Sequence, residues 1–446
     1  MLGPSQAKQI TDRVLALSKN GQTEVVLWVT DGALTRFANN IIHQNVAETN
    51  TSVTVRVALG QRVGVAGTNA VTDDGLAHVV ERAMELARSQ PENPDFAGFA
   101  EPKAFTPAGG FDEAAAAVTP EARARAVGEI CRQSKEASTL AAGAFSTDVQ
   151  EVAVANSHGL FCYHPATLCD LHSAVTAEGG GNGYGQVSSW KLADMVAEPV
   201  GREAVQKALR ARHPQPLEPG VFTVILEPYA AHDLLNMLNY VGFGARAMQE
   251  GRSWMNDRIG QQVLSPSVTI ADDGGDELGF PLPFDFEGVP KQKVVLVENG
   301  VPLGPVYDMT TARKEGRAST GHALPPPDTY GPTALNLAMS PGAATVEEMI
   351  RSTERGLYIT RFWYTRVVHP RDCIITGMTR DGVFLIENGE LTKPVKNLRF
   401  TQGYLPALAQ VEMLGKEAKT LSGGWLSAAR VPALKLKEFN FTGATQ

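Results

Sequence analysis

The sequence predicts an α+β protein, most of it a mainly antiparallel β body with a few covering helices. The 446 residues include 43 glycines and 27 prolines, which implies many turns. Short apolar runs of strand length recur along the chain, whereas apolar residues at helical spacing occur in only a few segments. A chain of this length is too long to fold around one ordinary hydrophobic core, so we expect two or three domains.

Composition and charge narrow the class of protein. Hydrophobic residues make up 43% and charged residues 20% of the chain, as in soluble globular proteins. A net charge of −8 and a pI near 5.7, without a Lys/Arg cluster, argue against nucleic acid as a partner. No apolar run is long enough for a membrane span, and the first residues lack the features of a signal peptide. Four cysteines are too few for a disulfide scaffold, so we expect a cytoplasmic protein.

The first half of the chain is predicted to alternate between helices and strands. Thr72 and Thr119 are predicted N-caps of two of the helices. The expected helices cover residues 5–19, Leu76–Arg88, 120–136 and Gly201–Arg212, and Gln90–Gly110 is expected to be a loop. The expected strands lie at Thr23–Val29, Ile41–Val46, Thr51–Leu59 and Gln61–Gly67, and within Ala141–Val187.

A glycine-rich break and a proline-rich break interrupt this pattern. Gly179–Gly185 lacks the Lys-Ser/Thr of a phosphate loop, so it is interpreted as a flexible hairpin tip. The prolines of HPQPLEPG cannot continue a helix, which places a domain boundary near 213–220. The predicted domains are therefore 1–213, possibly divided into 1–110 and 111–213, and 220–446.

The second domain is predicted to open with a strand, Phe222–Leu226, followed by a helix that begins at Pro228. An apolar stripe along that helix is formed by Ala231, Leu234, Leu235, Leu238 and Val241. Later strands are expected at Val268–Ile270, Val294–Glu298, Val301–Val306, Ile374, Gly382–Glu387, Lys393–Phe400 and Ala433–Phe441, with a helix over Ala407–Lys416.

The helix after Pro228 has the position of an active-site helix but few metal donors. Its polar face carries His232 with Asn236 and Asn239, and Met237 lies beside them. A zinc helix presents two imidazoles and a carboxylate. With one imidazole, His232 is expected to be a polar-face or substrate-groove residue. An earlier set with suggestive metal spacing is also interpreted as structural, because residues three apart on a strand point to opposite faces: Cys162, His164, Cys169 and His172.

The segment 285–322 holds the polar residues with the clearest binding potential. Asp285 and Glu287 lie on the same side of the chain if this segment is extended. They could then bind a cation or a peptide amine; the alternative is that both are solvated acids at a turn. Three cationic side chains could bind the C-terminal carboxylate or the backbone carbonyls of a peptide: Arg313, Lys314 and Arg317. The alternative is that they are solvated at the surface. His322 is a further candidate for peptide binding. It follows Ser319 closely, but sequence neighbours rarely form a catalytic triad, so serine hydrolysis is not predicted.

Five blocks in chain order resemble the TldD/PmbA (TldE) family, once called modulators of DNA gyrase. They are TRFANNIIHQNV at 35–46, VGREAVQKAL at 200–209, RIGQQVLSPSVTIADD at 258–273, DFEGVPKQKVVLVENGVPLGPVYDMTTARKEGRASTGHA at 285–322 and TGMTRDGVFLIENGELTKPVKNLRF at 376–400. The resemblance implies an N-terminal α/β domain and a C-terminal mainly β domain with an active-site helix. It further implies a zinc-dependent peptidase of two related subunits, of which only the TldD type carries His-Glu-x-x-x-His and a C-terminal cysteine ligand.

The catalytic motif of that family falls on HDLLNM in this chain. His232 matches the first ligand, Asp233 replaces the glutamate base, and Met237 replaces the second histidine. Where the ligand cysteine is expected the sequence is Leu421–Trp425, and the nearest cysteine, Cys373, lies much earlier. The resemblance is therefore to the TldE/PmbA-type subunit, which lacks the ligands.

Three functional hypotheses follow. The first is a non-catalytic TldE/PmbA-type subunit without its own metal, which pairs with a zinc-bearing TldD-type subunit and helps bind unfolded or modified peptides, for example at an exposed strand edge. The second is an active metallopeptidase in which His232 is joined by His322 or His369. The third is a homodimeric peptide-binding protein with no catalytic partner. In the first hypothesis, the contribution of this chain is binding and assembly, not bond cleavage.

Overall fold

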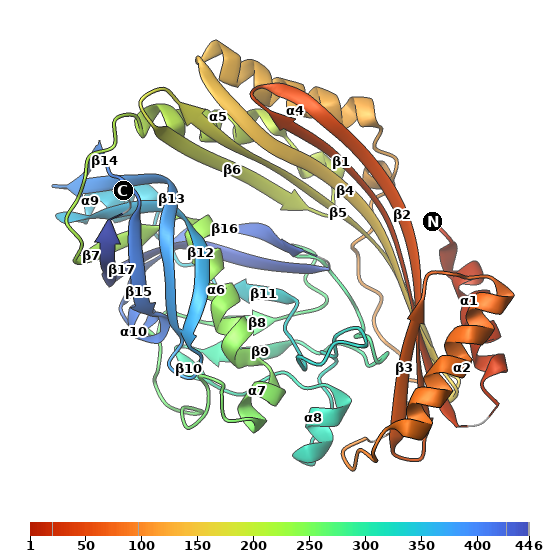
Figure 1. The fold of residues 1–446 in the computed structure, drawn as a ribbon. Helices are drawn as coiled ribbons and strands as arrows, with labels where there is room; N and C mark the ends of the chain where they lie inside the picture. The colour runs from red at the N-terminus through yellow and green to blue at the C-terminus, as the bar shows by residue number, and fades with distance from the viewer. Residues whose placement is uncertain (20, 97, 425, 445–446) are drawn as a thin grey trace.

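A computed structural model describes residues 1–19, 21–96, 98–424 and 426–444. A six-stranded sheet arches over a C-terminal lobe built on an eleven-stranded sheet (Figure 1). All pairings of the first sheet are antiparallel, and helices accompany both sheets, so the α+β prediction is confirmed. In spatial order the first sheet contains β3 (Arg62–Thr68), β2 (Ile41–Leu59), β1 (Gln22–Ala38), β4 (Thr139–Asn156), β5 (Phe161–Ala177) and β6 (Gly181–Ser189).

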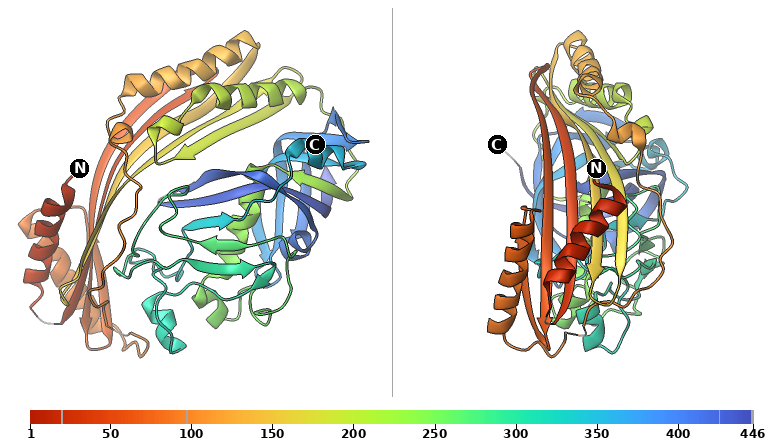
Figure 2. Two further views of the ribbon diagram at one scale, coloured as in Figure 1. Left: turned by 180° about the vertical axis from the view of Figure 1, so that it is seen from behind. Right: turned by 90° about the vertical axis from the view of Figure 1, so that its right-hand side faces the viewer.

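Helices cover the outer face of this sheet, and its concave face meets the C-terminal lobe (Figure 2). Because side chains alternate along a strand, Val25 and Leu27 pack under the helices while Val26 packs toward the lobe. The helices are α1 (Gly3–Leu17), α2 (Asp73–Ser89), α3 (Glu113–Ala116), α4 (Pro120–Glu136), the short η1 (Leu192–Asp194) and α5 (Ala197–Arg210). Side chains on both faces of the sheet therefore pack against other elements, but β2 is only half buried: Val53, Val55 and Val57 are buried, whereas residues 43–50 are exposed.

Two predicted strands are one strand in the structure. The expected runs Ile41–Val46 and Thr51–Leu59 join in β2, because the polar residues between them keep their pairing with β1, from Ala33 with Ala47 to Thr30 with Asn50. Backbone pairing, which no apolar pattern reports, holds this stretch in the sheet.

The glycine-rich segment is also different from the prediction. Only Gly179 and Gly180, both with positive φ, form the turn, and the following glycines belong to β6. A Cβ on Gly183 would lie 2.1 Å from the Ala204 carbonyl oxygen of α5, and one on Gly181 would lie 2.1 Å from that of Ala208. Glycine is required here because α5 packs directly against the backbone of β6, and the segment is not a flexible tip.

The second sheet is mixed and partly closed. β7 pairs with β12 and also with β17, and since β12, β13, β15 and β17 pair in succession, five strands form a closed ring. The pairs β11–β17 and β12–β7 are parallel, so the body is not antiparallel throughout. The strands are β7 (Val221–Leu226), β8 (Ile270–Asp272), β9 (Val294–Glu298), β10 (Val301–Pro302), β11 (Asn336–Met339), β12 (Arg355–His369), β13 (Ile374–Glu387), β14 (Glu390–Pro394), β15 (Leu398–Gly403), β16 (Val411–Gly424) and β17 (Ser427–Ala444).

Short helices fill the space around this ring. The predicted apolar stripe after Pro228 is buried in the main core of the lobe. The helices are α6 (Pro228–Leu238), the π-helical η2 (Asn239–Phe243), α7 (Ala245–Gln249), α8 (Met309–Lys314), α9 (Val346–Arg351) and α10 (Tyr404–Ala409). In the described part of the chain no helix is both long enough and apolar enough to cross a membrane.

Several predicted boundaries in the lobe are wrong. The expected helix Ala407–Lys416 ends at Ala409, and β16 begins at Val411 because this segment pairs with β17. The run Lys393–Phe400 is divided between β14 and β15, and Val301–Val306 forms only the two-residue β10. A few apolar residues fit helical and strand periods equally well, so pairing decides such segments.

Candidate functional site

Helix α6 occupies the position predicted for an active-site helix. β7 leads through the N-cap Glu227 into Pro228, and the helix packs on β12 and β17. His232 faces the opposite strand, β16. Burial lowers the pKa of His232 to about 4, and a contact with the Leu421 backbone opposes this shift only in part. The imidazole is therefore neutral at physiological pH.

Neighbouring side chains do not complete a ligand set around His232. The Asn236 amide nitrogen lies 3.2 Å from both ring nitrogens of His232, so an amide occupies the space beside the imidazole. Met237 is partly buried and packs against the main core. In the C-terminal segment where the resemblance expects a ligand cysteine, Leu421–Gly424 presents no thiol, and Trp425 lies outside the described residues.

Asp233 is held in the interior of the lobe. Its Oδ1 accepts a hydrogen bond from the Tyr404 hydroxyl at 2.9 Å, and its Oδ2 accepts one from Thr365 at 2.7 Å. Burial raises the pKa of Asp233 to about 6, although both hydrogen bonds oppose the shift. These partners belong to α10 and β12, while His232 contacts β16, so the carboxylate is not directed to the imidazole.

These residues do not fit a zinc ion. Zinc in a peptidase needs several imidazole, carboxylate or thiolate donors around one point. The described residues contain no group of three or more His, Cys, Asp or Glu that could hold a metal ion. His322 and His369, the alternative ligands, are occupied elsewhere: His322 is bonded to Asp272 at 2.8 Å, and His369 lies 3.1 Å from Asp372 near the β12–β13 turn.

Asp285 and Glu287 are buried, not solvated, and they have different hydrogen-bond partners. Asp285 accepts hydrogen bonds from the main-chain N–H groups of Glu287, Val289 and Ala323, so it fixes a turn. Glu287 accepts the N–H of Met309 at 2.9 Å and lies 3.5 Å from Arg56 of β2. Burial and then the charge of Glu287 raise the pKa of Asp285. Asp285 is therefore not available to a peptide, whereas Glu287 lies at a junction between the sheet and the lobe.

The predicted cations separate around α8. Arg313, Lys314 and Arg317 are all exposed. Lys314 forms an ion pair with Asp95 at 3.0 Å. Arg317 lies 3.5 Å from Glu315 and stacks over Tyr307, and Arg313 and Arg317 line a cavity that Lys314 does not. The three side chains thus do not form one site.

His322 fixes a turn in the interior. Thr320, not Ser319, places its hydroxyl 2.9 Å from His322 Nδ1. The same hydroxyl accepts the N–H of Tyr307 and donates to its carbonyl, and His322 is only 1% exposed. The hydroxyl–imidazole–Asp272 chain is a structural clamp, and it holds the side chain of His322, a predicted peptide-binding residue, in the interior.

The cysteines and histidines with suggestive metal spacing have separate partners. Cys162 contacts the Gly288 carbonyl, and the His164 imidazole lies 3.0 Å from the Pro281 carbonyl. His172 lies 2.9 Å from Asp170, and Cys169 is buried in another cluster. Burial, partly opposed by the contact with Pro281, lowers the pKa of His164 to about 4. They form no common ligand group.

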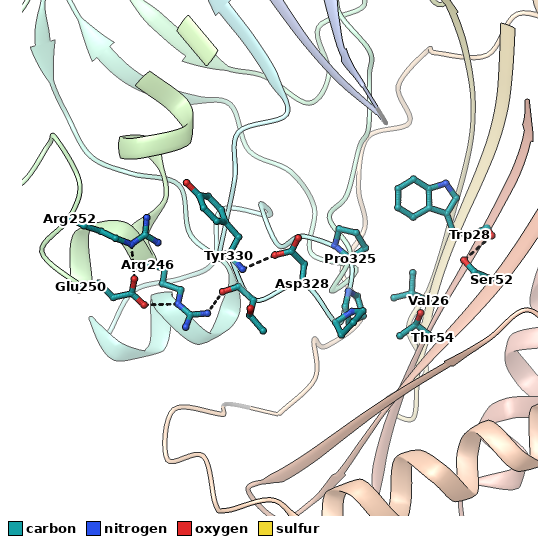
Figure 3. Close-up of a pocket in the computed structure, with 13 residues that line it drawn as sticks. Val26, Trp28, Ser52, Thr54, Arg246, Glu250, Arg252, Pro325, Asp328 and Tyr330 are labelled. Carbon is teal, nitrogen blue, oxygen red and sulfur yellow. Dashed lines mark hydrogen bonds and ion pairs between the residues drawn. The ribbon is translucent and has the colours of Figure 1, made fainter. Parts of the chain in front are cut away.

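A large opening lies where the sheet meets the lobe (Figure 3). This cavity of about 860 Å³, here named the inter-lobe groove, has Val26, Trp28, Ser52 and Thr54 on one wall. The facing wall belongs to the C-terminal lobe. It consists of Arg246 on α7, Glu250 and Arg252 just after that helix, and the segment Pro325–Tyr330. Its volume falls within the range of small-molecule and peptide side-chain sites.

The walls of the inter-lobe groove are held in place. The Trp28 indole donates to Gln150 at 3.0 Å and its ring centre lies 5.2 Å from that of Phe286. Tyr330 stacks on Tyr240, with ring centres 5.3 Å apart, and the Arg252 guanidinium lies over its ring. Trp28 comes from the sheet and Tyr330 from the lobe, so aromatic side chains on both walls suit an extended segment with apolar or aromatic side chains.

Glu250 fastens the lobe wall of the groove. It accepts hydrogen bonds from Arg246 at 2.8 Å and Arg252 at 2.7 Å, and Arg246 also donates to the Thr329 carbonyl. These bonds lower the pKa of Glu250. Sequence reasoning missed this groove, because its residues come from four distant segments. The run of prolines at 325–327 was the only local signal.

A smaller polar cavity of about 450 Å³ continues the groove and shares Arg246, Glu250 and Asp328 with it. Arg56 projects into it and donates to Glu24 at 2.7 Å. Burial raises the pKa of Glu24 to about 7, Arg56 opposes the shift, and Glu287 adds to it. An ion cluster therefore joins the sheet to the lobe.

A second buried ion network lies at the start of α6. Lys207 of α5 forms ion pairs with Glu203 at 2.7 Å and with the N-cap residue Glu227 at 2.5 Å. Tyr229 accepts a hydrogen bond from Lys419 of β16 at 2.6 Å. The network connects the outer helix of the sheet with α6 and was also missed, since its members lie far apart in sequence.

Comparison with known proteins is consistent along the chain. Profiles of the PmbA/TldA metallopeptidase match successive regions: domain 1 at residues 24–87, the central domain at 113–212 and the C-terminal domain at 219–443. The metalloprotease PmbA of Escherichia coli O157:H7 is 24% identical over 451 residues, covering 97% of this chain and 92% of that protein. A metalloprotease TldD homolog of Haemophilus influenzae is 28% identical over 268 residues, covering 56% of this chain and 54% of its own length.

Solved structures share the fold. TldE from Thermococcus kodakarensis superposes with a TM-score of 0.89 at 19% identity, covering 98% of this chain and 100% of that one. A putative modulator of a DNA gyrase from Thermotoga maritima gives 0.85 at 19% identity, with 98% and 100% covered. The profile of the C-terminal domain alone spans half of the chain. The chain belongs to the PmbA/TldD metallopeptidase family.

Proposed function

We propose that this chain is a non-catalytic TldE/PmbA-type subunit, which pairs with a TldD-type zinc subunit and helps bind unfolded or modified peptides. One observation carries the proposal: the single imidazole of α6 has an amide as its neighbour, while Asp233 is bonded to Tyr404 and Thr365. A chain without a ligand set contributes by binding and assembly. The proposed location is the cytoplasm, with which four free cysteines are consistent.

The inter-lobe groove is the proposed place of peptide contact. It offers two fixed aromatic rings, Trp28 and Tyr330, and hydroxyl groups of β2 on the face of the sheet. An extended peptide can lay apolar side chains against these rings with little sequence preference. Addition of a peptide strand to an open edge such as β3 remains a separate prediction.

The proposed partner surface is a bulge in β12. The pairing of β12 with β13 shifts register between Trp363 and Arg366, and Trp363 and Tyr364 are 43% and 64% exposed. Arg361 and Arg380 stack on Trp363, and Arg366 stacks on Tyr364. We name these five residues the bulge face. Trp, Tyr and Arg dominate the energetics of protein interfaces, and the positive charge suits an acidic partner surface.

Metal content and reconstitution test the proposal. The purified chain should contain substoichiometric zinc and cleave no unfolded peptide, and mixing with a TldD-type subunit should give a peptidase that a chelator inactivates. Trp28→Ala and Tyr330→Ala should each weaken peptide binding about tenfold, whereas Trp28→Phe retains most of it. Stoichiometric zinc and cleavage by the chain alone would overturn the proposal.

A further inference from the structure

A cavity distinct from the inter-lobe groove lies beside α8. Its volume is about 820 Å³, and it shares no lining residue with the groove or its polar continuation. One wall is the 98–103 segment with His158, and the other is α8 with the 289–292 segment. Figure 1 shows α8 at the lower end of the C-terminal lobe, on the side that faces the long sheet.

The inner part of this cavity is apolar and well fixed. Phe99 is 3% exposed and Ala312 is 1% exposed, and Met309 packs in the neighbouring core. The ring centre of Phe99 lies 5.4 Å from that of Phe96, and the Arg56 guanidinium lies 5.3 Å from it. Such a floor accepts an apolar side chain and offers nothing to a fully hydrated anion such as phosphate.

The rim of the cavity is positively charged. Lys103, Arg313 and Arg317 line it, and its acidic residue, Glu101, lies 2.9 Å from His158. Within the described part of the chain, Lys103 and Arg313 have no carboxylate at ion-pair distance. The chain has a net charge of −8, so its average surface is negative. The positive rim is therefore a local feature of this cavity.

We propose that this cavity binds the free C-terminal carboxylate of a peptide whose last residue is apolar. The carboxylate meets the Arg313 guanidinium and the Lys103 ammonium, and the last side chain lies against Phe99 and Met309. Guanidinium–carboxylate hydrogen bonds are charge-assisted and directional, so the free carboxylate is the recognised group. The proposal deepens the proposed function, since it names the end by which a peptide is held, but it requires neither a partner subunit nor zinc.

Binding of paired peptides to the purified chain tests this site. A fluorescent peptide ending in free leucine should bind at least about tenfold more tightly than the same peptide with a C-terminal amide, because the amide removes the charge. Arg313→Gln, alone and with Lys103→Gln, should abolish this preference. Lys314→Gln is the matched control, since this neighbour pairs with Asp95 and does not line the cavity; it should retain the preference.

The outcomes separate this site from the proposed function. Equal affinity for acid and amide, or a preference that survives Arg313→Gln in a chain of unchanged melting temperature, overturns the carboxylate site. If Trp28→Ala loses all peptide binding and Arg313→Gln loses none of it, the peptide binds in the inter-lobe groove alone, which overturns the carboxylate site. Direct binding of decanoate to a chain that binds neither the acid nor the amide peptide overturns the peptide as ligand. Stoichiometric zinc and peptide cleavage by the isolated chain would overturn the proposal of a non-catalytic subunit, but not the carboxylate site.

Discussion

Asp233 is the residue at which family position and local structure differ most. The family resemblance places it where a catalytic base is expected, yet its carboxylate accepts hydrogen bonds from Tyr404 and Thr365 inside the lobe. Burial raises its pKa from an ordinary 3.8 to about 6. Between these two pH values the folded chain holds a proton that the unfolded chain has lost, so the free energy of unfolding falls as pH rises through this window.

Asp233→Asn should remove that pH dependence. The asparagine is neutral, so relative to the natural chain its free energy of unfolding should rise by about 2–3 kcal/mol between pH 4 and pH 7. Denaturant unfolding at several pH values measures this difference. Peptide cleavage by the reconstituted complex should not change. A pH-independent difference would show that the carboxyl ionises normally, and loss of cleavage would return Asp233 to catalysis.

Arg56 is the residue that neutralises acids at the junction of the sheet and the lobe. It donates to Glu24 and lies 3.5 Å from Glu287, both of which are buried. Arg56→Met leaves two carboxylates without a counter-charge. We expect a loss of about 3–5 kcal/mol in the free energy of unfolding at pH 8.

The pH dependence of this loss is its signature. Burial already raises the pKa of Glu24 to about 7, and removal of Arg56 raises it further. Near pH 5 the carboxyl is protonated in the folded chain, so the loss should shrink. The double variant Glu24→Gln, Arg56→Met should recover much of the stability at pH 8. An equal loss at both pH values would instead indicate lost packing against Phe99.

Among the elements, the contact between α5 and β6 depends on glycine. Gly183→Ala places a Cβ 2.1 Å from the Ala204 carbonyl oxygen and 2.5 Å from the Ala208 nitrogen, both main-chain atoms. The helix must move away from the strand, and we expect a loss of about 3 kcal/mol in the free energy of unfolding.

A second glycine provides the matched control. Gly128 lies within α4, and no atom outside its own helix lies within 4 Å of an added Cβ. Gly128→Ala should stabilise the chain by about 1 kcal/mol, because alanine loses less backbone entropy in a helix. Thermal unfolding of both variants measures the contrast. A stable Gly183→Ala chain would mean that α5 can slide without loss.

The same elements show how far the sequence leads. Caps and apolar stripes depend on nearby residues, so Thr119 and Pro120 located the start of α4, and the stripe of α6 is buried as predicted. Pairing partners lie far apart, so the continuity of β2 and the strand state of Val411 were not predictable. The lack of metal donors on α6 follows from residue types alone. The groove and the cavity beside α8 required the fold.

At the scale of the whole molecule, the proposed partner surface is the bulge face of β12, where the rings of Trp363 and Tyr364 are exposed. Tyr364 has a φ of +58°, a conformation that non-glycine residues rarely adopt, and it presents the ring to solvent. Strain of this kind persists where the surrounding structure holds it, often at binding sites. Arg361 pairs with Asp381 and stacks over Tyr184 of β6, so the positive charge of this face comes from Arg366 and Arg380.

This charge argues for an unlike partner. A two-fold pairing of identical chains through the bulge face would set arginines against arginines, whereas an acidic face on a TldD-type subunit would neutralise them. The variant Trp363→Ala, Tyr364→Ala should weaken assembly with that subunit at least tenfold, with little change in melting temperature because both rings are exposed. Arg366→Glu with Arg380→Glu should weaken it similarly. Ile41→Ala is the control, because Ile41 is also an exposed apolar residue but lies on β2, away from β12. Light scattering of the chain alone and of mixtures distinguishes the possibilities: unchanged assembly of the double variant would place the partner elsewhere, and dimers of the isolated chain lost in that variant would favour self-association.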